Sequence, residues 1–305
     1  MSHHPVILFV YKRPDHTKRT LEALARCEGA QETSLVVYSD GPKIETDRVA
    51  VDEVRNLIRF ARGFRSVRCV EASHNQGLAK SVIAGVSQVL DEAEACIVVE
   101  DDLNLAPSFL TFLNSALDRY RSDRHVFSLS GYGPPPRRVP AGDPGEVWFA
   151  PRPCSWGWAI WKDRWQKVDW DLSDREAFFS DPEARRCFES GGRDLSYFLR
   201  LQLKGELDSW AVRMAWSQSR VGGLTLYPAR SFVDNRGLDG SGTHSRAEGD
   251  QEIVLGEATI PMRWPEPFDP SAQLLKRFRR HYEGSWTERW AIRVEKVMRF
   301  LRGAG

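Results

Sequence analysis

The chain has few cysteines, and their arrangement excludes two common uses of this residue. The five cysteines among its 305 residues are scattered, and no two of them have the CxxC spacing of a zinc site. Their number is odd, whereas a secreted disulfide framework usually has an even number. We therefore expect free thiols and a reducing, cytoplasmic setting.

Long apolar runs and an excess of charge of one sign are also lacking. No run is long enough to span a bilayer, and the run 6–10 lacks the length and basic flank of a signal peptide. The formal net charge of +1 creates no strong field for nucleic acid, so we expect no nucleic-acid partner. A composition of 41% hydrophobic and 28% charged residues is typical of a soluble globular protein.

What the first part of the chain does contain is an alternation of strand and helix patterns. Continuous apolar runs predict covered strands, and apolar residues at helical spacing predict the helices between them. The predicted strands are 6–11, 35–38, 67–70, 95–99 and 126–129. This alternation indicates an α/β fold with a parallel sheet and right-handed crossovers.

Polar residues follow the ends of several predicted strands. Arg13 follows the first strand, Asp40 the second and Asp101-Asp102 the fourth, and His74 comes a few residues after the third. Ligands of parallel sheets bind outside the carboxyl ends of the strands. We therefore expect these side chains to meet at one edge of the sheet.

The acidic triplet Glu100-Asp101-Asp102 is the strongest chemical signal. Adjacent carboxylates repel one another unless cations or hydrogen bonds compensate. Hard oxygen ligands suit Mg²⁺ or Mn²⁺, with phosphate oxygens and waters completing the shell. The triplet therefore predicts a metal and nucleotide site, and its alternative interpretation is a solvated acidic turn before the next helix.

The pattern changes after a Pro/Gly-rich stretch at 131–145. The tryptophan-rich region that follows predicts a second layer, which packs on the sheet edge and shapes an acceptor site. Helices are predicted at 195–205 and 210–219, a short strand at 224–227 and a glycine-rich loop at 235–245. We divide the chain into an α/β half (1–131), an acceptor-side half of the same domain (132–260) and a helical extension (261–305).

Several stretches, in this order, resemble GT-A glycosyltransferases, and most closely the N-acetylglucosaminyltransferase I family and its bacterial relatives. Val98–Pro107 (VVEDDLNLAP) is similar to the family's DxD element in its Glu-Asp-Asp form. The resemblance runs from about Pro5 to His244. Its other segments are 5–13, 39–40, 155–161, 207–213 and 227–244.

The resemblance implies a Rossmann-like, mostly parallel GT-A sheet flanked by helices and followed by an acceptor-side region. Beyond it, the residue pattern predicts a terminal basic amphipathic helix. It also implies inverting transfer of a sugar from a nucleotide-sugar donor, a UDP-sugar for preference, with Mn²⁺ or Mg²⁺ as cofactor. The acceptor would be a glycan or a lipid-linked sugar, as in polysaccharide biosynthesis. In such a reaction the cation stabilises the charge that grows on the departing diphosphate.

Residue by residue, the resemblance implies the following roles. Arg13 and Asp40 would hold the nucleoside base with His74 nearby, and Glu100 and Asp101 would belong to the donor site, with Asp101 on the ribose or a phosphate. Asp102 would ligate the metal directly. His244, in the glycine-rich loop, would bind metal or diphosphate, although a solvent-exposed loop histidine is an equal alternative.

The resemblance also indicates a catalytic base that takes the proton of the acceptor hydroxyl. The family has two adjacent carboxylates before a tryptophan, whereas this chain has Asp208-Ser209-Trp210. Our first choice is Asp208, with Glu206 and Asp194 as fallbacks. The structural alternative for Asp208 is a cap at the start of the following helix.

Two further features have a functional and a structural interpretation. Trp156, Gly157 and Trp158 could contact a sugar, because aromatic faces stack on sugar rings and the glycine permits close approach; the alternative is a place in the core. The basic amphipathic helix predicted at 274–301, with a break near 284–285, fits either the protein surface or an anionic inner membrane face.

Two competing functions remain open. A sugar-phosphate nucleotidyltransferase would share the nucleotide-binding sheet and the carboxylate-held cation, but the segment Tyr11–Asp15 lacks the glycine-rich phosphate loop of that class. A carbohydrate-binding protein on an inactive GT-A scaffold is the other alternative. The intact acidic triplet argues against it, whereas the altered segment around Asp208 keeps it open.

Overall fold

The computed structural model describes residues 2–134, 147–237 and 272–283, together with positions 255, 264, 266 and 270. His244 and most of the glycine-rich loop, as well as the predicted helix beyond Glu283, lie outside these residues.

An eight-stranded mixed sheet forms the centre of the structure, with the strand order β3-β2-β1-β4-β8-β6-β9-β7. Only β8 and β7 run against their neighbours. The predicted α/β class, with a mostly parallel sheet flanked by helices, is therefore confirmed. The strands are β1 (Val6–Val10), β2 (Ser34–Ser39), β3 (Ser66–Glu71), β4 (Ala95–Glu100), β6 (Val126–Ser130), β7 (Val147–Ala150), β8 (Trp158–Trp161) and β9 (Leu224–Pro228).

A small antiparallel pair, β5 (Leu103–Leu105) and β10 (Val233–Asn235), lies outside this sheet. β5 follows the acidic triplet directly, so β10 brings a segment from more than a hundred residues later in the chain beside it. The sequence patterns predicted neither strand, because each has only three residues.

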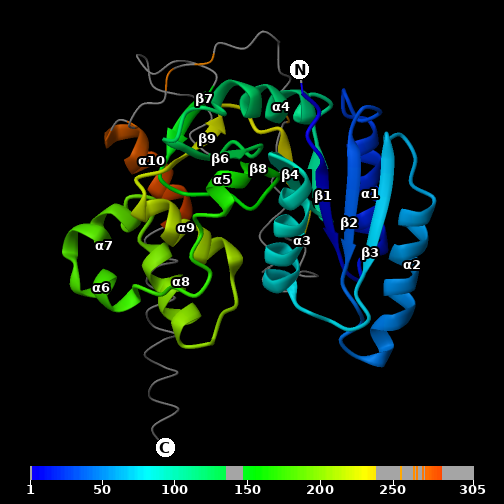
Figure 1. Cartoon of the computed structure of the whole chain (residues 1–305), viewed down its shortest axis with the longest axis horizontal. Coiled ribbons are helices and arrows are strands. Elements are labelled where there is room, and N and C mark those ends of the chain that lie inside the picture. The colour runs from blue at the N-terminus through cyan, green and yellow to red at the C-terminus, as the bar shows by residue number, and fades with distance from the viewer. Residues whose placement is uncertain are drawn as a thin grey trace, which may run out of the picture.

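Helices cover both faces of the sheet (Figure 1). Their bounds are α1 (Pro14–Ala25), α2 (Arg48–Arg59), α3 (Leu78–Glu92), α4 (Phe109–Tyr120), α5 (Lys162–Trp165), α6 (Arg175–Ser180), α7 (Pro182–Glu189), α8 (Asp194–Leu203), α9 (Trp210–Arg220) and α10 (Ala272–Glu283), with a 3-10 turn, η1, at Glu45–Asp47.

The alternation of side chains along β1 decides which helices cover which face. Val6, Leu8 and Val10 join the cluster that includes residues of α1, α2 and α4. Ile7 and Phe9 point the other way and join residues of α3 and α9. Because all five are buried, β1 is a central strand, which explains its continuous apolar run.

A third apolar cluster lies beside the sheet, where α6 to α9 gather at the lower left of Figure 1. Phe188 of α7 and Trp216 of α9 are buried at its centre. α9 belongs both to this cluster and to the cluster that contains Ile7, Phe9 and residues of α3. It therefore attaches the small helices α6 to α8 to the α/β core.

The tryptophan-rich region was predicted as a second layer on the sheet edge, and this prediction is wrong. Trp158 and Trp161 lie on β8, which pairs with β4 and β6 inside the sheet, and Trp148 lies on β7. All three are buried. The alternation of large residues with Ala159 and Ile160 fits a strand covered on both faces, but β7 and β8 are too short to show a clear period.

Helix α10 begins the predicted basic extension and packs on the protein. Leu274 and Phe278 are buried, and the Phe278 ring lies 5.2 Å from that of Trp148 and 5.4 Å from that of Tyr227. This part of the helix therefore follows the structural interpretation. Within the described ranges, no helix combines the length and the apolarity needed to cross a membrane.

The cysteines give a test of this fold. All five are free, and only Cys187, on α7, is exposed. Burial raises the pKa of Cys27 to about 12 and that of Cys69 to about 11, which suppresses the reactive thiolate. We predict that one thiol of the native protein reacts rapidly with a chromogenic disulfide reagent, and that five react after denaturation. Cys187→Ser should abolish the rapid phase; a rapid phase that persists would contradict the burial of Cys27, Cys96 and Cys154 and the partial burial of Cys69.

Candidate functional site

The acidic triplet meets Arg13 at the carboxyl edge of the sheet. β1 and β4 are parallel neighbours, so the segments that follow them lie side by side. Arg13 Nη2 contacts Asp101 Oδ1 and lies 2.9 Å from Asp102 Oδ2, while its Nε lies 3.4 Å from Asp101 Oδ2. The predicted convergence of Arg13, Asp101 and Asp102 is therefore observed. The contact of Arg13 with a nucleoside base stays a prediction.

The electrostatics of this cluster are unbalanced. Burial raises the pKa of Asp101, and the neighbouring Arg13 opposes that rise. Burial also raises the pKa of Glu100, to about 8, and the charges of Asp102 and Asp101 add to the effect. One guanidinium therefore faces two aspartates and a glutamate that resists ionisation. Additional positive charge at this edge would be stabilised.

Two polar atoms of the cluster are buried without a hydrogen-bond partner: Asp102 Oδ1 and Arg13 Nη1. Leaving such an atom unpaired costs about 1–3 kcal/mol. Asp102 Oδ1 is an acceptor that suits a hard cation, and Arg13 Nη1 is a donor that suits a phosphate oxygen. Among the residues that the structure describes, no group of three or more His, Cys, Asp and Glu could hold a metal ion. The free Oδ1 of Asp102 could supply one ligand to a cation whose remaining ligands come from phosphate and water.

The turn that carries Asp102 is fixed from two sides. The Thr20 hydroxyl, on α1, lies 2.8 Å from the carbonyl oxygen of Asp101 and 2.9 Å from that of Leu103. After β10, the amide of Arg236 donates to the carbonyl oxygen of Asp102 at 2.8 Å. Gly237 packs so closely that an added Cβ would lie 2.0 Å from Asp102 Oδ2, so any larger residue would displace the carboxylate.

Asp40 has a different role from the one predicted. Its two oxygens accept four hydrogen bonds: from the amides of Gly41, Gln76 and Gly77, and from the side chain of Asn75, at 2.8–3.1 Å. These bonds use the acceptor capacity of a carboxylate. The predicted contact with a nucleoside base would require one of them to break. In the structure, Asp40 fixes the loop that leads into α3.

His74 belongs to the same loop and is exposed. Its Nδ1 lies 3.1 Å from Ser73 Oγ, and Gly41 packs against its backbone, where an added Cβ would come within 2.5 Å. The structure thus places His74 beside the end of β2, and a contact with the base stays a prediction.

Sequence reasoning missed a second contact between the strand-end loops. Asp47, in η1, accepts hydrogen bonds from the Tyr11 hydroxyl and from Lys12 Nζ, both at 2.7 Å. These donors lower the pKa of Asp47 to about 2. The loop after β2 is thereby fixed to the residues that precede Arg13. No local sequence pattern indicated these contacts, because the pattern around Asp47 predicted only the start of a helix.

The three residues of the predicted sugar-contact motif separate in the structure. Trp158 is buried between the rings of Trp210 (4.8 Å) and Trp165 (6.0 Å), so it has no free face and its predicted sugar contact is wrong. Gly157 is buried with φ +59°, and an added Cβ would meet Val233 and Phe109 within 2.9 Å.

Trp156 is only half-buried and packs edge-to-face on Tyr132 at 4.6 Å. Of the three residues, it alone keeps exposed surface for a sugar. Its sugar contact stays a prediction.

Asp208 lies just before α9 and forms an ion pair with Arg213. Its side chain is 67% exposed, and the cap of α9 is Ser209, whose hydroxyl accepts from the Val212 amide at 3.3 Å. The alternative role of Asp208 as the helix cap is therefore wrong. Of the two fallbacks, Asp194 is bound in a two-point ion pair with Arg152 at 2.8 and 2.9 Å, while Glu206 is exposed.

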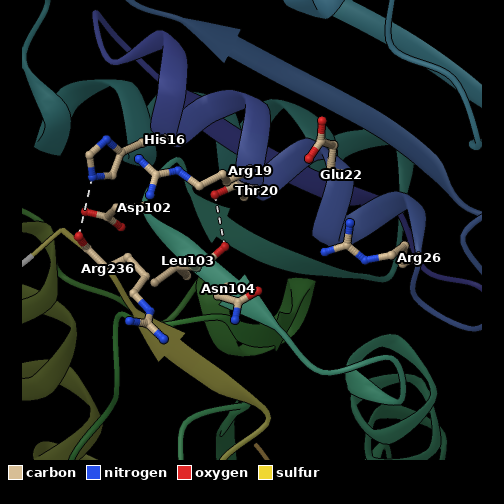
Figure 2. A pocket seen from close by; sticks show the side chains of 9 residues that line it. All are labelled: His16, Arg19, Thr20, Glu22, Arg26, Asp102, Leu103, Asn104 and Arg236. Carbon is tan, nitrogen blue, oxygen red and sulfur yellow. Dashed lines mark hydrogen bonds between the residues drawn. The ribbon is translucent and has the colours of Figure 1, made fainter. Parts of the chain in front are cut away.

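A pocket of about 320 Å³ opens beside Asp102, between α1 and the β5–β10 pair (Figure 2). Three arginines and a histidine border it, and the sequence analysis singled out none of them. The lining residues are His16, Arg19, Thr20, Glu22, Arg26, Asp102, Leu103, Asn104 and Arg236. A helical repeat on α1 that places His16, Arg19 and Arg26 on one side was the only sequence signal.

Comparison with known proteins gives only distant likenesses. No family model matches the chain. A mannosyltransferase from Pyrobaculum calidifontis, in complex with GDP-Man and Mn²⁺, is 16% identical over 53% of this chain and 45% of its own, with a TM-score of 0.38. S. aureus TarS 1-349 is 16% identical over 76% of this chain and 60% of its own, with a TM-score of 0.42. Its complex with UDP-GlcNAc is 18% identical over 57% of this chain and 48% of its own, with a TM-score of 0.34.

The chain thus spans about half the length of these solved structures. Because these TM-scores are low, conclusions about the fold and the function must rest on the chain's own residues.

The four bonds to Asp40 generate a prediction. Asp40→Asn replaces one acceptor oxygen by an NH₂ group that faces donors, so the free energy of unfolding should fall by about 1–3 kcal/mol. Denaturant titration would measure it, and amide hydrogen exchange should accelerate at Gln76 and Gly77. Asp52→Asn, an exposed carboxylate on α2, is the matched control. Unchanged exchange at both amides would show that Asp40 does not hold this loop.

Proposed function

We propose that the chain is an inverting glycosyltransferase, which transfers a sugar from a nucleotide-sugar donor to a glycan or lipid-linked acceptor with Mn²⁺ as cofactor. A UDP-sugar is the preferred donor. The observation that carries the proposal is the pair of unpartnered buried atoms, Asp102 Oδ1 and Arg13 Nη1, at the carboxyl edge of the sheet. A metal-bound diphosphate would satisfy both.

The donor would lie over the loops that follow β1, β2 and β3. Asp47 and Asp40 hold these loops in place through Tyr11, Lys12 and Gln76. A preorganised edge of this kind lowers the entropic cost of ordering loops around a ligand. His74 is the side chain proposed to face the nucleoside, and Asp40 acts through the loop that it fixes. The base contact predicted for Arg13 is replaced by a contact of its free Nη1 with the diphosphate.

Asp102 would hold the cation, which when bound supplies charge stabilisation to the departing diphosphate. Arg13 orients Asp102 through Oδ2 and leaves Oδ1 for the metal. Gly237 keeps the carboxylate in that orientation because no side chain intervenes. Asp101 is engaged by Arg13 and serves to fix that guanidinium.

An acceptor hydroxyl must lose a proton as it attacks the sugar, and Asp208 is our choice of base. The N-terminus of α9 lies beside the sheet, because Trp210 stacks on Trp158 and Trp158 pairs with Val98, two residues before Glu100. Arg213 holds the exposed carboxylate of Asp208. Trp156 is proposed to contact the sugar or the acceptor.

The metal assignment is tested by Asp102→Asn. Loss of the unpartnered carboxylate oxygen should weaken Mn²⁺-dependent UDP binding by about tenfold or more and abolish UDP release from nucleotide sugars. Calorimetry with and without Mn²⁺ and a coupled UDP assay measure the two effects.

Asp91→Asn, an exposed carboxylate at the end of α3, serves as the control for this test. Parental UDP release by the Asp102 variant would disprove the assignment. UDP binding by the parental chain without release from any UDP- or GDP-sugar would favour a carbohydrate-binding protein instead.

The assignment of the base is tested by Asp208→Asn against Glu206→Gln. If Asp208 takes the proton, its variant should lower kcat by about 10²–10⁴-fold and leave UDP affinity unchanged. The Glu206 variant should retain the parental kcat. The opposite pattern would transfer the role to Glu206, and equal small effects in both variants would remove it from this segment.

A further inference from the structure

The pocket between α1 and the β5–β10 pair has a cationic wall that the proposed donor site does not use. Arg19 lies on α1 and Arg26 is the residue that follows its last turn, with Glu22 between them in the sequence. Within the described ranges, the side chain of Arg19 makes a single hydrogen bond, from its Nε to the carbonyl oxygen of Asp15 at 3.1 Å, and the side chain of Arg26 makes no hydrogen bond or ion pair. Their forked donors are therefore available to an anion.

The opposite wall is polar and fixed in place. Arg236 is held by Asp234 at 2.6 Å, and its carbonyl oxygen lies 3.4 Å from His16 Nε2. Asn104, on β5, contributes an amide side chain. Figure 2 shows Arg236 and Asn104 across the pocket from α1, and Asp102 beside His16. Only two carboxylates border the pocket, and one of them, Asp102, already faces Arg13.

The pocket lies apart from the proposed nucleoside site. Its lining comes from α1, from Asp102 with β5, and from the segment after β10. It includes no residue of the loops after β2 and β3, where Asp40 and His74 lie. A molecule in the pocket could therefore lie beside Asp102 without occupying those loops, as an acceptor must when the donor is bound there.

We propose that this pocket binds an oxyanion group, a phosphate or a carboxylate, of an acidic sugar acceptor. The inference rests on the proposed glycosyltransferase function and names its acceptor class. Arg19 and Arg26 supply the charge-assisted bonds, Asn104 supplies a neutral donor, and a volume of about 320 Å³ lies at the small end of the range for ligand pockets.

The first experiment measures the pocket without metal or nucleotide. The full-length chain is titrated by calorimetry with glucose 6-phosphate, glucuronate and glucose. We expect the two anions to bind about tenfold more tightly than glucose, and Arg19→Gln/Arg26→Gln to abolish that difference. Lys18→Gln/Arg62→Gln removes the same charge from the neighbouring surface formed by α1 and the segment after α2, and should leave the difference intact. No preference for the anions, or equal loss in both double variants, would overturn the proposal.

The second experiment separates an acceptor from the donor's own diphosphate. UDP with Mn²⁺ should bind the Arg19/Arg26 variant as tightly as the parental chain, and the UDP-saturated parental chain should still bind glucose 6-phosphate. If the variant weakens UDP as strongly as glucose 6-phosphate, or if UDP displaces the sugar phosphate, the arginines serve the diphosphate and the acceptor assignment fails. Anion binding by a chain that does not bind UDP would instead retain the anion pocket and disprove the glycosyltransferase.

Discussion

The contact between Arg13 and the two aspartates that end β4 is the interaction on which the rest of the site depends. It joins neighbouring parallel strands at the edge of the sheet, where their backbone pairing has ended. An ion pair of this kind, largely removed from water, contributes little net stability, because desolvation of the charges offsets their attraction. Its effect is geometric: it gives each carboxylate one orientation and leaves one oxygen of Asp102 without a partner.

Structure far along the chain maintains that geometry. The β5–β10 pair brings Arg236 and Gly237 against Asp102, one through a backbone hydrogen bond and the other through the absence of a side chain. Thr20 holds the same turn from α1. Three segments with no local relation in sequence therefore determine the position of one carboxylate, and the same segments form the walls of the adjacent pocket.

This arrangement explains which parts of the molecule the sequence could predict. Periodicity predicted β1, β2 and β4 and the helices between them, because strands covered on both faces read as continuous apolar runs. β3, which lies at the edge of the sheet and is only partly buried, was also predicted. Strand-end topology then placed Arg13 near Asp101 and Asp102. Local patterns do not encode pairing between short distant segments, so β5, β8 and β10 were missed. The burial of Trp158 and the cationic wall facing Asp102 depend on these strands and were therefore missed as well.

Asp40 shows a different limit of sequence reasoning. Its position after β2 was predicted correctly, but position alone does not distinguish a carboxylate that faces a ligand from one that holds a loop. The difference lies in the donors that surround it: three backbone amides and an asparagine side chain, which only the folded loop brings together. A carboxylate with every acceptor position used is a structural element, whereas Asp102, with one position unused, is a candidate ligand.

The charge balance at the edge also bears on how a nucleotide sugar would bind. Arg13 neutralises one of the two aspartates, and burial together with the neighbouring aspartates raises the pKa of Glu100. The remaining charge is negative and would repel a bare diphosphate. A divalent cation at Asp102 reverses the sign, and Arg13 Nη1 then offers a donor to the same phosphate group. Donor and cation should therefore bind as one unit, because neither is well accommodated at this edge without the other.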